Sequence, residues 1–405
     1  MSVSSGTRVQ SDGTMGLMDG LFGRKSIEAV PYADLVEGAN DVVLAVHAAQ
    51  GTVLYANQAL TGLLGYEREE IIGRSFAELC EASQVLRSAE LIAEAWEKGG
   101  AVSTELTLRH KTEKDPIPVE ISTRVTQVGK APAIILYIRD IRERLRLTRM
   151  IAEKNQQLLD SISYARRLQS GALPPATAFK KLFPESFLLY LPRDIVSGDF
   201  YWVSETSRSY LVAVGDCTGH GVPGAMMVML MLAFLNQALA DLEDPSPARL
   251  LTFLHQQVCQ IFDTEKIRDG ADMIILELFK SEPVIRWASA NRPLWWIVRE
   301  EFGEEKGERT SIGGYTDPEY TFSDRQLIIQ ENIRLYMFSD GYADQFGGPD
   351  YKKLSTGRFK RFIQSIAHEP LSQQGEVLHR FFIEWKGDTE QIDDVLVVGI
   401  SWDRP

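Results

Sequence analysis

The stretch 214–225, with the sequence VGDCTGHGVPGA, decides how the C-terminal half of the chain is interpreted. An apolar run that begins near Ser209 leads into Asp216, and a glycine-rich segment follows at once. This order is typical of a strand that ends in a tight turn, and the glycines allow the backbone to turn sharply and start a helix. An aspartate at such a place projects a hard oxygen ligand from a rigid element.

Three further aspartates stand at the same kind of position. Asp199 lies in SGDFYW, Asp340 in FSDGYADQFGG, and Asp393 in QIDDVLVVG. A single aspartate at the end of a strand is more often a turn or cap residue than a ligand. Four such turns in one region instead predict a site built from carboxylate oxygens, which suits Mg²⁺ or Mn²⁺ rather than zinc.

These strings resemble the PPM family of 2C-type metal-dependent protein phosphatases, most closely the bacterial sigma-factor regulators typified by SpoIIE and RsbU. The resemblance spans residues 160 to 403. It rests on SYARRLQSGALPP, LPRDIVSGDFYW, VGDCTGHGVPGAMM, SANRPLWWI and SDGYADQFGG. It implies an αββα sandwich of two antiparallel sheets, within an α+β chain, that hydrolyses phosphoserine or phosphothreonine in proteins.

The resemblance also implies roles for the motif aspartates. Asp216 would bridge two Mn²⁺ or Mg²⁺ ions, and the carbonyl of Cys217 would contribute to one of them. Asp340 and Asp393 would each bind an ion, whereas Asp199 would be an outer or water-mediated ligand. A water that bridges the two ions would then attack the phosphate.

Four further residues have supporting or alternative roles in this scheme. Asp344 would reach a further, weak metal, and Asp394 would support the ligands from outside. His220 would orient water or protonate the leaving oxygen, although a structural turn histidine fits the sequence equally well. Arg193 is the nearest candidate for an arginine that grips phosphate, but a charged surface-loop residue is the favoured interpretation.

Residues 28–142 alternate short apolar runs with turn signals, a pattern of half-buried antiparallel strands. The segment resembles the PAS fold. The matching residues are Asn40-Asp41, Gly51, Tyr55-Ala56-Asn57, Leu64-Gly65-Tyr66, Ile72-Gly73 and Arg139-Asp140-Ile141. The resemblance implies a sensor or dimerisation module, and it leaves the PAS ligand unidentified.

Residues 143–172 are expected to form a helical linker, because 141–170 contain no proline or glycine. Heptad steps predict a parallel dimeric coiled coil, with Asn155 fixing the register; a solvated connector helix is the alternative. The predicted seam is Ile141, Leu145, Thr148, Ala152, Asn155, Leu159 and Ile162. We expect a homodimer through the PAS domain and this helix.

Bulk composition narrows the remaining possibilities. The net charge of −13 argues against nucleic-acid binding, and three scattered cysteines predict a reducing compartment. No apolar run reaches the length of about 18 residues that a membrane span needs. We therefore expect the stretch 222–235 to form a buried helix. We also expect residues 1–27 to form a disordered tail and the protein to be cytoplasmic.

Competing classes of signalling protein fit less well. A histidine kinase needs a phosphoacceptor histidine on the linker, and residues 111–219 contain none. A diguanylate cyclase needs a Gly-Gly-Asp-Glu-Phe turn, which residues 197–201 only superficially resemble. The sequence thus predicts a PAS-regulated phosphatase in residues 180–403, whose substrate by resemblance is a phosphorylated STAS-type anti-sigma-factor antagonist. The alternative is a catalytically silent scaffold that docks signalling partners.

Overall fold

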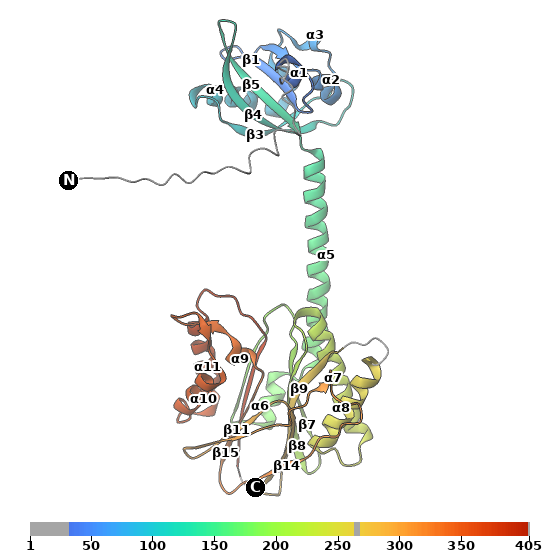
Figure 1. The fold of residues 1–405 in the computed structure, drawn as a ribbon, viewed down its shortest axis with the longest axis vertical. Helices are drawn as coiled ribbons and strands as arrows, with labels where there is room; N and C mark the ends of the chain where they lie inside the picture. Colours follow the sequence, from blue (N-terminus) through green and yellow to red (C-terminus); the bar gives the residue numbers. More distant parts are fainter. Residues whose placement is uncertain (1–31, 263–267, 404–405) are drawn as a thin grey trace, which may run out of the picture. The chain divides into compact units, whose positions relative to one another are not determined.

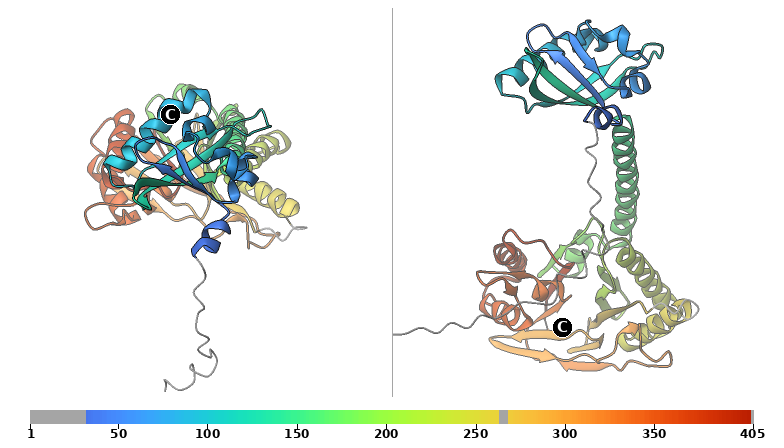
Figure 2. Two further views of the ribbon diagram at one scale, coloured as in Figure 1. Left: turned by 90° about the horizontal axis from the view of Figure 1, so that it is seen from above. Right: turned by 45° about the horizontal axis from the view of Figure 1, so that its top comes forward.

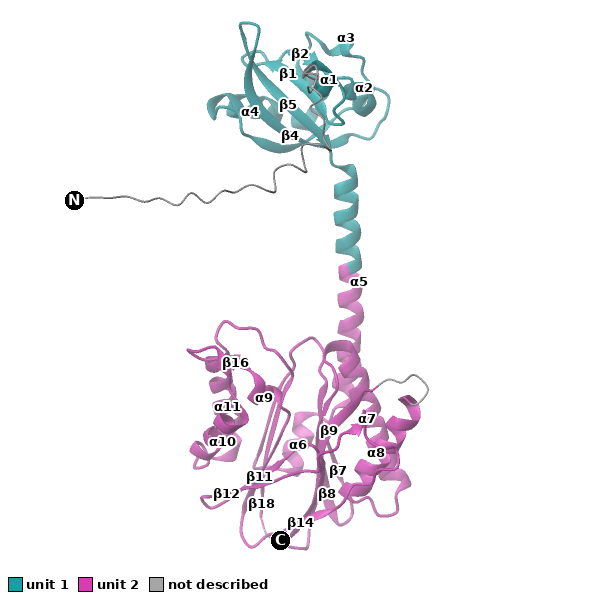
Figure 3. Cartoon of the chain, viewed as in Figure 1, with its two compact units in different colours: residues 1–154 teal, residues 155–405 magenta. Residues whose placement is uncertain are grey.

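The computed structural model describes residues 32–262 and 268–403. The expected tail of residues 1–27 lies outside this part of the chain. The chain divides into two compact units, 1–154 and 155–405, whose boundary falls within helix α5 (Arg142–Ala172) (Figures 1 and 3). Each unit is described by itself below.

The first unit is built on one antiparallel sheet of five strands in the order β2-β1-β5-β4-β3. The strands are β1 (Val42–His47), β2 (Val53–Ala56), β3 (Ser103–Leu108), β4 (Ile117–Val128) and β5 (Ala131–Asp140). The helices are α1 (Tyr32–Glu37), α2 (Ala59–Leu64), α3 (Arg68–Ile71), η1 (Phe76–Leu79), η2 (Ala82–Gln84) and α4 (Val85–Glu97). One face of the sheet and these helices enclose an apolar core that includes Leu44, Phe76 and Leu136.

Two of the motif positions in this unit have clear structural tasks. The buried Asn57 side chain accepts a hydrogen bond from the Val43 N–H and donates to the carbonyls of Val36 and Asp41. Arg139, near the end of β5, forms an ion pair with Asp41 at 2.8 Å. Asn57 therefore connects the start of β1 to α1, and Arg139 connects it to β5.

Helix α5 begins one residue after Ile141, near the expected start of the linker. It continues through Gly171 and ends at Ala172, before Pro174-Pro175. Most of its residues are exposed, and Gln169 is the one buried residue on it.

The second unit contains two large antiparallel sheets and the small two-stranded sheet β16-β17 (Figure 2). One has the order β14-β10-β9-β8-β7, with β13 paired to β9, and the other has the order β12-β11-β15-β18-β6. The strands of the first are β7 (Asp199–Glu205), β8 (Ser209–Cys217), β9 (Gly270–Phe279), β10 (Val284–Ala290), β13 (Ile312–Gly313) and β14 (Arg325–Ile328). Those of the second are β6 (Ser186–Leu191), β11 (Leu294–Val298), β12 (Glu301–Glu305), β15 (Ile333–Phe338) and β18 (Val395–Trp402).

Helices cover the outer faces of these sheets (Figure 1). The remaining elements are α6 (Ala176–Leu182), α7 (Gly221–Asp241), α8 (Pro247–Phe262), α9 (Gly341–Asp344), β16 (Phe346–Gly347), β17 (Lys352–Lys353), α10 (Thr356–Ser365) and α11 (Leu371–Lys386). One core joins the two sheets to α7 and α8. Another lies between the second sheet and α10 and α11.

Strand β18 shows how one sequence serves both cores. Leu396 and Val398 belong to the core between the sheets, whereas Val395 and Val397 belong to the core under α10 and α11. Successive side chains of a strand point to opposite faces, so a continuous apolar run fits a sheet that is covered on both sides. The expected fold class, α+β with an αββα sandwich in the second unit, is confirmed.

Helix α7 has the length and composition of a membrane-crossing helix, with 21 residues and a mean hydropathy of 1.7. It is the one such helix in the part of the chain that the structure describes. Its residues Val228, Met231 and Leu235 are nonetheless buried in the core shared by the two sheets. This is the pattern of a core helix, as expected for residues 222–235.

Candidate active site

Three aspartates lie side by side across neighbouring strands of the first sheet. Asp216 near the end of β8 is in register with Asp199 at the start of β7 and with Asp272 on β9. Like charges directly opposite each other destabilise a sheet unless something compensates them. Local folding therefore concentrates negative charge at one edge of this sheet.

The second sheet supplies two more carboxylates to the same place. Asp340 follows β15 and is the N-cap residue of α9, and Asp393 immediately precedes the Asp394 peptide that leads into β18. Strands β15 and β18 are paired, so their connections meet at one end of that sheet. Asp216, Asp340 and Asp393 line one cavity of about 840 Å³.

The guanidinium of Arg292 lies among these carboxylates. Its Nη2 is 2.6 Å from Asp216 Oδ2, 3.1 Å from Asp340 Oδ2 and 3.5 Å from Asp272 Oδ2. The residue is only 9% exposed, and its buried Nε has no hydrogen-bond partner among the described residues. A single cationic group thus faces carboxylates from three different strands or loops.

The side chains present fit divalent cations by chemistry and by charge. The donors are all carboxylate oxygens, the type that Mg²⁺ and Mn²⁺ prefer, and a cationic group already occupies the middle of the set. When all are ionised, the aspartates and one arginine leave four negative charges, which two divalent cations would cancel. The five aspartates are Asp199, Asp216, Asp272, Asp340 and Asp393. Within the described residues, however, no three His, Cys, Asp or Glu side chains form a ready ligand shell.

Burial makes the uncompensated charge costly. It raises the pKa of Asp216 to about 8, against the opposing effect of Arg292, and the nearby carboxylates add to the rise. Burial also raises the pKa of Asp199 well above its usual value, with the charge of Asp216 as the next cause. The pKa of Asp393 is raised as well, first by burial. Groups of this kind mark sites where a cation or a proton is required.

Asp199 is buried and does not line the cavity. It is 1% exposed, and its Oδ2 accepts a hydrogen bond of 2.6 Å from the Ser339 hydroxyl. The same hydroxyl accepts the Leu396 N–H. Ser339 therefore links β7 of the first sheet to the ends of β15 and β18 in the second.

Asp394 organises the loop before β7. Its two carboxylate oxygens accept the backbone N–H groups of Arg193 and Gly198, both at 2.7 Å. The side chain is buried, and both of its oxygens are engaged by these bonds. The structure therefore gives Asp394 the task of fixing the loop that leads to Asp199, while the Arg193 side chain is exposed.

The remaining expected site residues are placed as follows. Asp344, at the end of α9, forms an ion pair of 2.9 Å with Lys353 and does not line the cavity. His220 lines the cavity as the N-cap of α7, with Nδ1 3.1 Å from Asp194 Oδ2. Cys217 also lines it, and burial raises the pKa of its thiol.

Sequence reasoning missed four residues that the structure adds. Asp272 accepts a hydrogen bond of 2.7 Å from Ser311 and one of 3.1 Å from Asn291. Asn291 has a positive φ of 60°, an uncommon backbone state for a residue other than glycine. Arg292 follows Asn291 in the SANRP string. That string supported the family resemblance, but it did not indicate that Asn291 and Arg292 contact the aspartates.

Two antiparallel sheets between helical layers, with an acidic cluster at their edge, define the class of PP2C-type phosphatase domains. The family model of Stage II sporulation protein E (SpoIIE) matches residues 206–403, and the PAS fold model matches residues 36–146. The C-terminal domain therefore belongs to the SpoIIE family of PP2C-type phosphatases, and a PAS domain precedes it. The resemblances drawn from the motifs are confirmed.

Solved structures resemble the chain to different degrees. The SiaA PP2C domain of Pseudomonas aeruginosa is 29% identical, with a TM-score of 0.57; the match covers 62% of this chain and all of that one. The phosphatase domain with a regulatory fragment of SpoIIE from Bacillus subtilis is 13% identical, with a TM-score of 0.45 and coverage of 76% and 80%. The RsbU and RsbW domains of a Mycobacterium tuberculosis protein are 16% identical, with a TM-score of 0.45 and coverage of 55% and 61%. The comparison with curated proteins found no match.

Proposed function

We propose that the chain is a PAS-regulated, Mn²⁺- or Mg²⁺-dependent phosphatase that hydrolyses phosphoserine or phosphothreonine in a protein substrate. The carrying observation is the gathering of Asp216, Asp272 and Asp340 around the guanidinium of Arg292. These residues come from separate parts of the chain, and nothing in the packing of the two sheets requires so many carboxylates at one edge.

The cluster gives each side chain a task toward bound cations. Asp216, Asp340 and Asp393 would hold them at the cavity wall, and the Asn291 and Ser311 side chains would keep Asp272 oriented. When bound, divalent cations would supply an activated water and neutralise charge on the phosphoryl oxygens.

His220 is placed to handle a proton beside the cavity. Its Nδ1 faces Asp194, and Nε2 bonds to no other residue in the described part of the chain. A general acid must lie within hydrogen-bond reach of the group it protonates. We assign His220 to protonating the serine or threonine oxygen that leaves.

The direct test is release of phosphate from a phosphoserine protein with Mn²⁺, with Mg²⁺ and with a chelator. The proposal expects turnover with either cation and none with the chelator. Equal turnover in the chelator would contradict the role assigned to the acidic cluster, because nothing else at this edge would activate water.

A silent scaffold is the second candidate, and one observation favours it. Arg292 holds the carboxylates in an arrangement without a ready metal shell. A protein that stays inactive with Mn²⁺, yet is folded by circular dichroism and still binds the phosphoprotein, would support this second candidate.

Regulation by the PAS domain would act through α5. Gln169, buried at the end of this helix, donates to the Ser197 carbonyl at 2.6 Å and accepts its N–H at 3.1 Å. Ser197 lies two residues before Asp199, whose N–H bonds to the Ser197 hydroxyl. A shift of α5 would therefore move the loop beneath the cavity. Gln169→Leu is expected to weaken the response to the PAS domain while preserving cation binding.

The proposal extends to a cytoplasmic homodimer that acts on a phosphorylated STAS-type anti-sigma-factor antagonist. Helix α5 exposes Ile151 and Leu158 at 61% and 62%, and Leu159 of the expected seam at 47%. A second copy of the helix would cover such apolar side chains. Light scattering on the full chain and on a chain that lacks residues 28–172 tests the dimer; an unchanged dimer in the shorter chain would contradict it.

A further inference from the structure

Another part of the cavity lining differs in character from the aspartates. It carries two arginines, Arg268 and Arg309, together with Tyr315. All three are exposed, and Tyr315 is 88% exposed. The Arg268 guanidinium lies over the Tyr315 ring, 5.3 Å from its centroid. We refer to these three residues as the basic rim.

The two rim arginines lack counter-ions among the residues that the structure describes. No ion pair or hydrogen bond joins the side chain of Arg268 or Arg309 to another described residue. Glu308, next to Arg309, instead accepts hydrogen bonds from the Tyr320 hydroxyl and the Ser323 N–H. In a chain with a net charge of −13, two unpaired cations on one cavity wall are a local exception.

A buried histidine holds the segment that carries Tyr315. His255 on α8 is fully buried; its Nδ1 accepts the Gly313 N–H at 3.0 Å, and its Nε2 lies 2.8 Å from the Asp317 carbonyl. These two contacts require a neutral ring with the proton on Nε2. Thr316 adds a bond of 2.8 Å from its hydroxyl to the Ser311 carbonyl. Tyr315 is thus exposed on a loop that is fixed at both ends.

One carboxylate lines the cavity near the basic rim, that of Asp317, which accepts the Glu319 N–H. Two arginines against one aspartate leave this part of the cavity lining positive. An exposed aromatic ring on a fixed loop, beside arginine, has the composition of a protein-docking surface.

We propose that the basic rim docks the polypeptide around the phosphorylated residue and selects phosphosites whose neighbouring residues are acidic. The inference rests on the phosphatase function proposed above and specifies its substrate. The phosphate would enter among the aspartates, and Arg268 and Arg309 would bind carboxylates of the flanking residues. The Tyr315 ring would pack against the backbone between them.

The experiment compares three substrates with Mn²⁺ present. They are p-nitrophenyl phosphate and two phosphoserine peptides of equal length, with glutamate or with alanine on both sides of the phosphoserine. Arg309→Gln and Arg268→Gln are each expected to lower kcat/KM for the acidic peptide by about five- to tenfold, mainly through KM, because each loses a hydrogen bond between charged groups. Hydrolysis of p-nitrophenyl phosphate should change by less than about twofold.

Two control variants separate docking from general charge effects. Arg309→Lys keeps the charge and should recover most of the affinity for the acidic peptide. Arg358→Gln removes a half-buried arginine that also stacks on an aromatic ring, Trp385, at 4.8 Å, and that does not line the cavity. It should leave all three substrates unchanged.

The outcomes distinguish this inference from the function on which it depends. Equal losses on p-nitrophenyl phosphate and the acidic peptide would overturn the inference alone, since the arginines would then serve the phosphate itself. Equal kcat/KM of the wild type for the two peptides would also overturn it. A wild-type protein that hydrolyses none of the three substrates would overturn the phosphatase function and the inference together.

Discussion

Two groups of carboxylates lie toward opposite ends of the same paired strands, β8 and β9, and their charges are balanced differently. At one end, Asp216 is in register with Asp272; toward the other, Leu211 is in register with the buried Glu277. The first group lines the cavity of the candidate active site. The second lies away from it, near the connection between α7 and α8.

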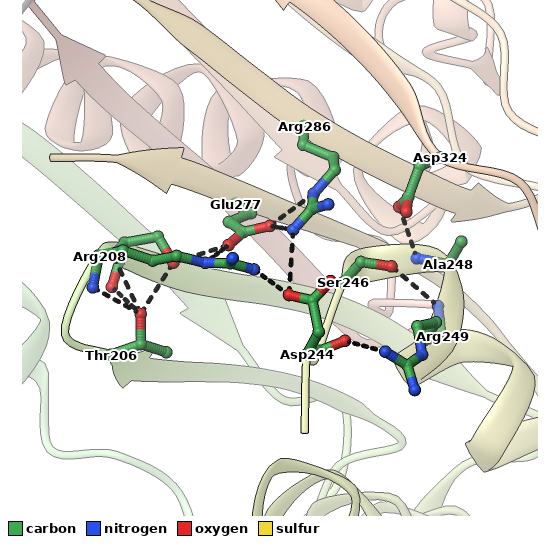
Figure 4. Close-up of polar contacts among 10 residues, drawn as sticks. Thr206, Arg208, Asp244, Ser246, Ala248, Arg249, Glu277, Arg286 and Asp324 are labelled. Atoms are coloured by element: carbon green, nitrogen blue, oxygen red, sulfur yellow. Dashed lines mark hydrogen bonds and ion pairs between the residues drawn. The ribbon is translucent and has the colours of Figure 1, made fainter. Parts of the chain in front are cut away.

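The group around Glu277 is balanced (Figure 4). Glu277 is 1% exposed and accepts hydrogen bonds from Arg286 at 2.7 Å and from the Ser209 hydroxyl at 2.8 Å, and Arg208 lies 3.5 Å away. Asp244 forms an ion pair with Arg208 and lies 3.9 Å from Arg286. Two carboxylates thus meet two guanidinium groups, and the set requires no further ion.

The contrast indicates which carboxylates serve structure and which serve function. Buried charges are retained when they are paired, and an unpaired excess is costly. The active-site group has five aspartates for one arginine, Arg292. Most of its negative charge is therefore left for a bound cation to balance. Charge imbalance, more than the number of acidic residues, separates the two ends of the sheet.

The largest expected effect comes from Asp216→Asn. Turnover of a phosphoserine substrate should fall by about 10³-fold or more, beyond the 10–100-fold typical of residues that only support a metal ligand. The apo protein should melt at the same temperature or higher, because asparagine is neutral without binding the proton that burial makes Asp216 retain. Phosphate release and calorimetric melting measure the two effects. Full residual activity would remove Asp216 from the site.

The matching change at the balanced end, Glu277→Gln, should have the opposite pattern. It leaves Arg286 and Arg208 without their buried partner and should destabilise the domain by about 3 kcal/mol. Urea unfolding of the full chain measures the loss. Mn²⁺ affinity should be unchanged, and a large loss of Mn²⁺ affinity would mean that the two ends are not independent.

The imbalance also predicts how stability depends on pH. The pKa of Asp216 is raised to about 8 in the folded protein, so the folded state binds a proton that the unfolded state has released above about pH 4. Apo stability is therefore highest at low pH within this range and falls as pH rises toward 8, by up to about 1.4 kcal/mol per pH unit for this group.

Melting of the metal-free protein between pH 5 and 8 measures this slope. Excess Mn²⁺ should reduce it, because a cation then replaces the proton, and Asp216→Asn should reduce it without any metal. A slope that is unchanged in Asp216→Asn would assign it to other groups.

Arg292→Gln tests whether the arginine competes with divalent cations for the carboxylates. Removing its positive charge should tighten Mn²⁺ binding by about tenfold, as expected for roughly 1.4 kcal/mol of lost repulsion and competition. Isothermal titration calorimetry measures the affinity, and Arg286→Gln at the balanced end is the control. Weaker Mn²⁺ binding in Arg292→Gln would show that the arginine builds the cation site instead.

Local signals in the sequence predicted most of the fold. Helix α8 (Pro247–Phe262) begins where the sequence marks a helix start, at the proline that follows Ser246. Strand β18 follows the expected apolar run. Helix α5 runs through Gly171 to Ala172, since one glycine costs a helix too little to end it.

The site was predictable only where a turn marked the residue. Asp216 and Asp340 stand before glycine-containing turns, and the structure brings both to the cavity. Asp272 lies inside β9 and acquires its place through register with Asp216, a pairing between distant segments that one sequence does not reveal. Arg292 likewise faces carboxylates 76 and 48 positions away in the chain, Asp216 and Asp340.

The smallest expected effect is that of Asp344→Asn, which tests how far the active-site group extends. The Asp344 carboxylate is directed to Lys353, and both side chains are nearly half exposed. A solvent-exposed ion pair of this kind contributes less than about 1 kcal/mol, so stability should hardly change. Turnover at saturating Mn²⁺ should also stay within about twofold, because the residue lies off the cavity wall. A marked rise in the Mn²⁺ concentration needed for activity would instead place Asp344 among the ligands, in an arrangement where Lys353 releases it.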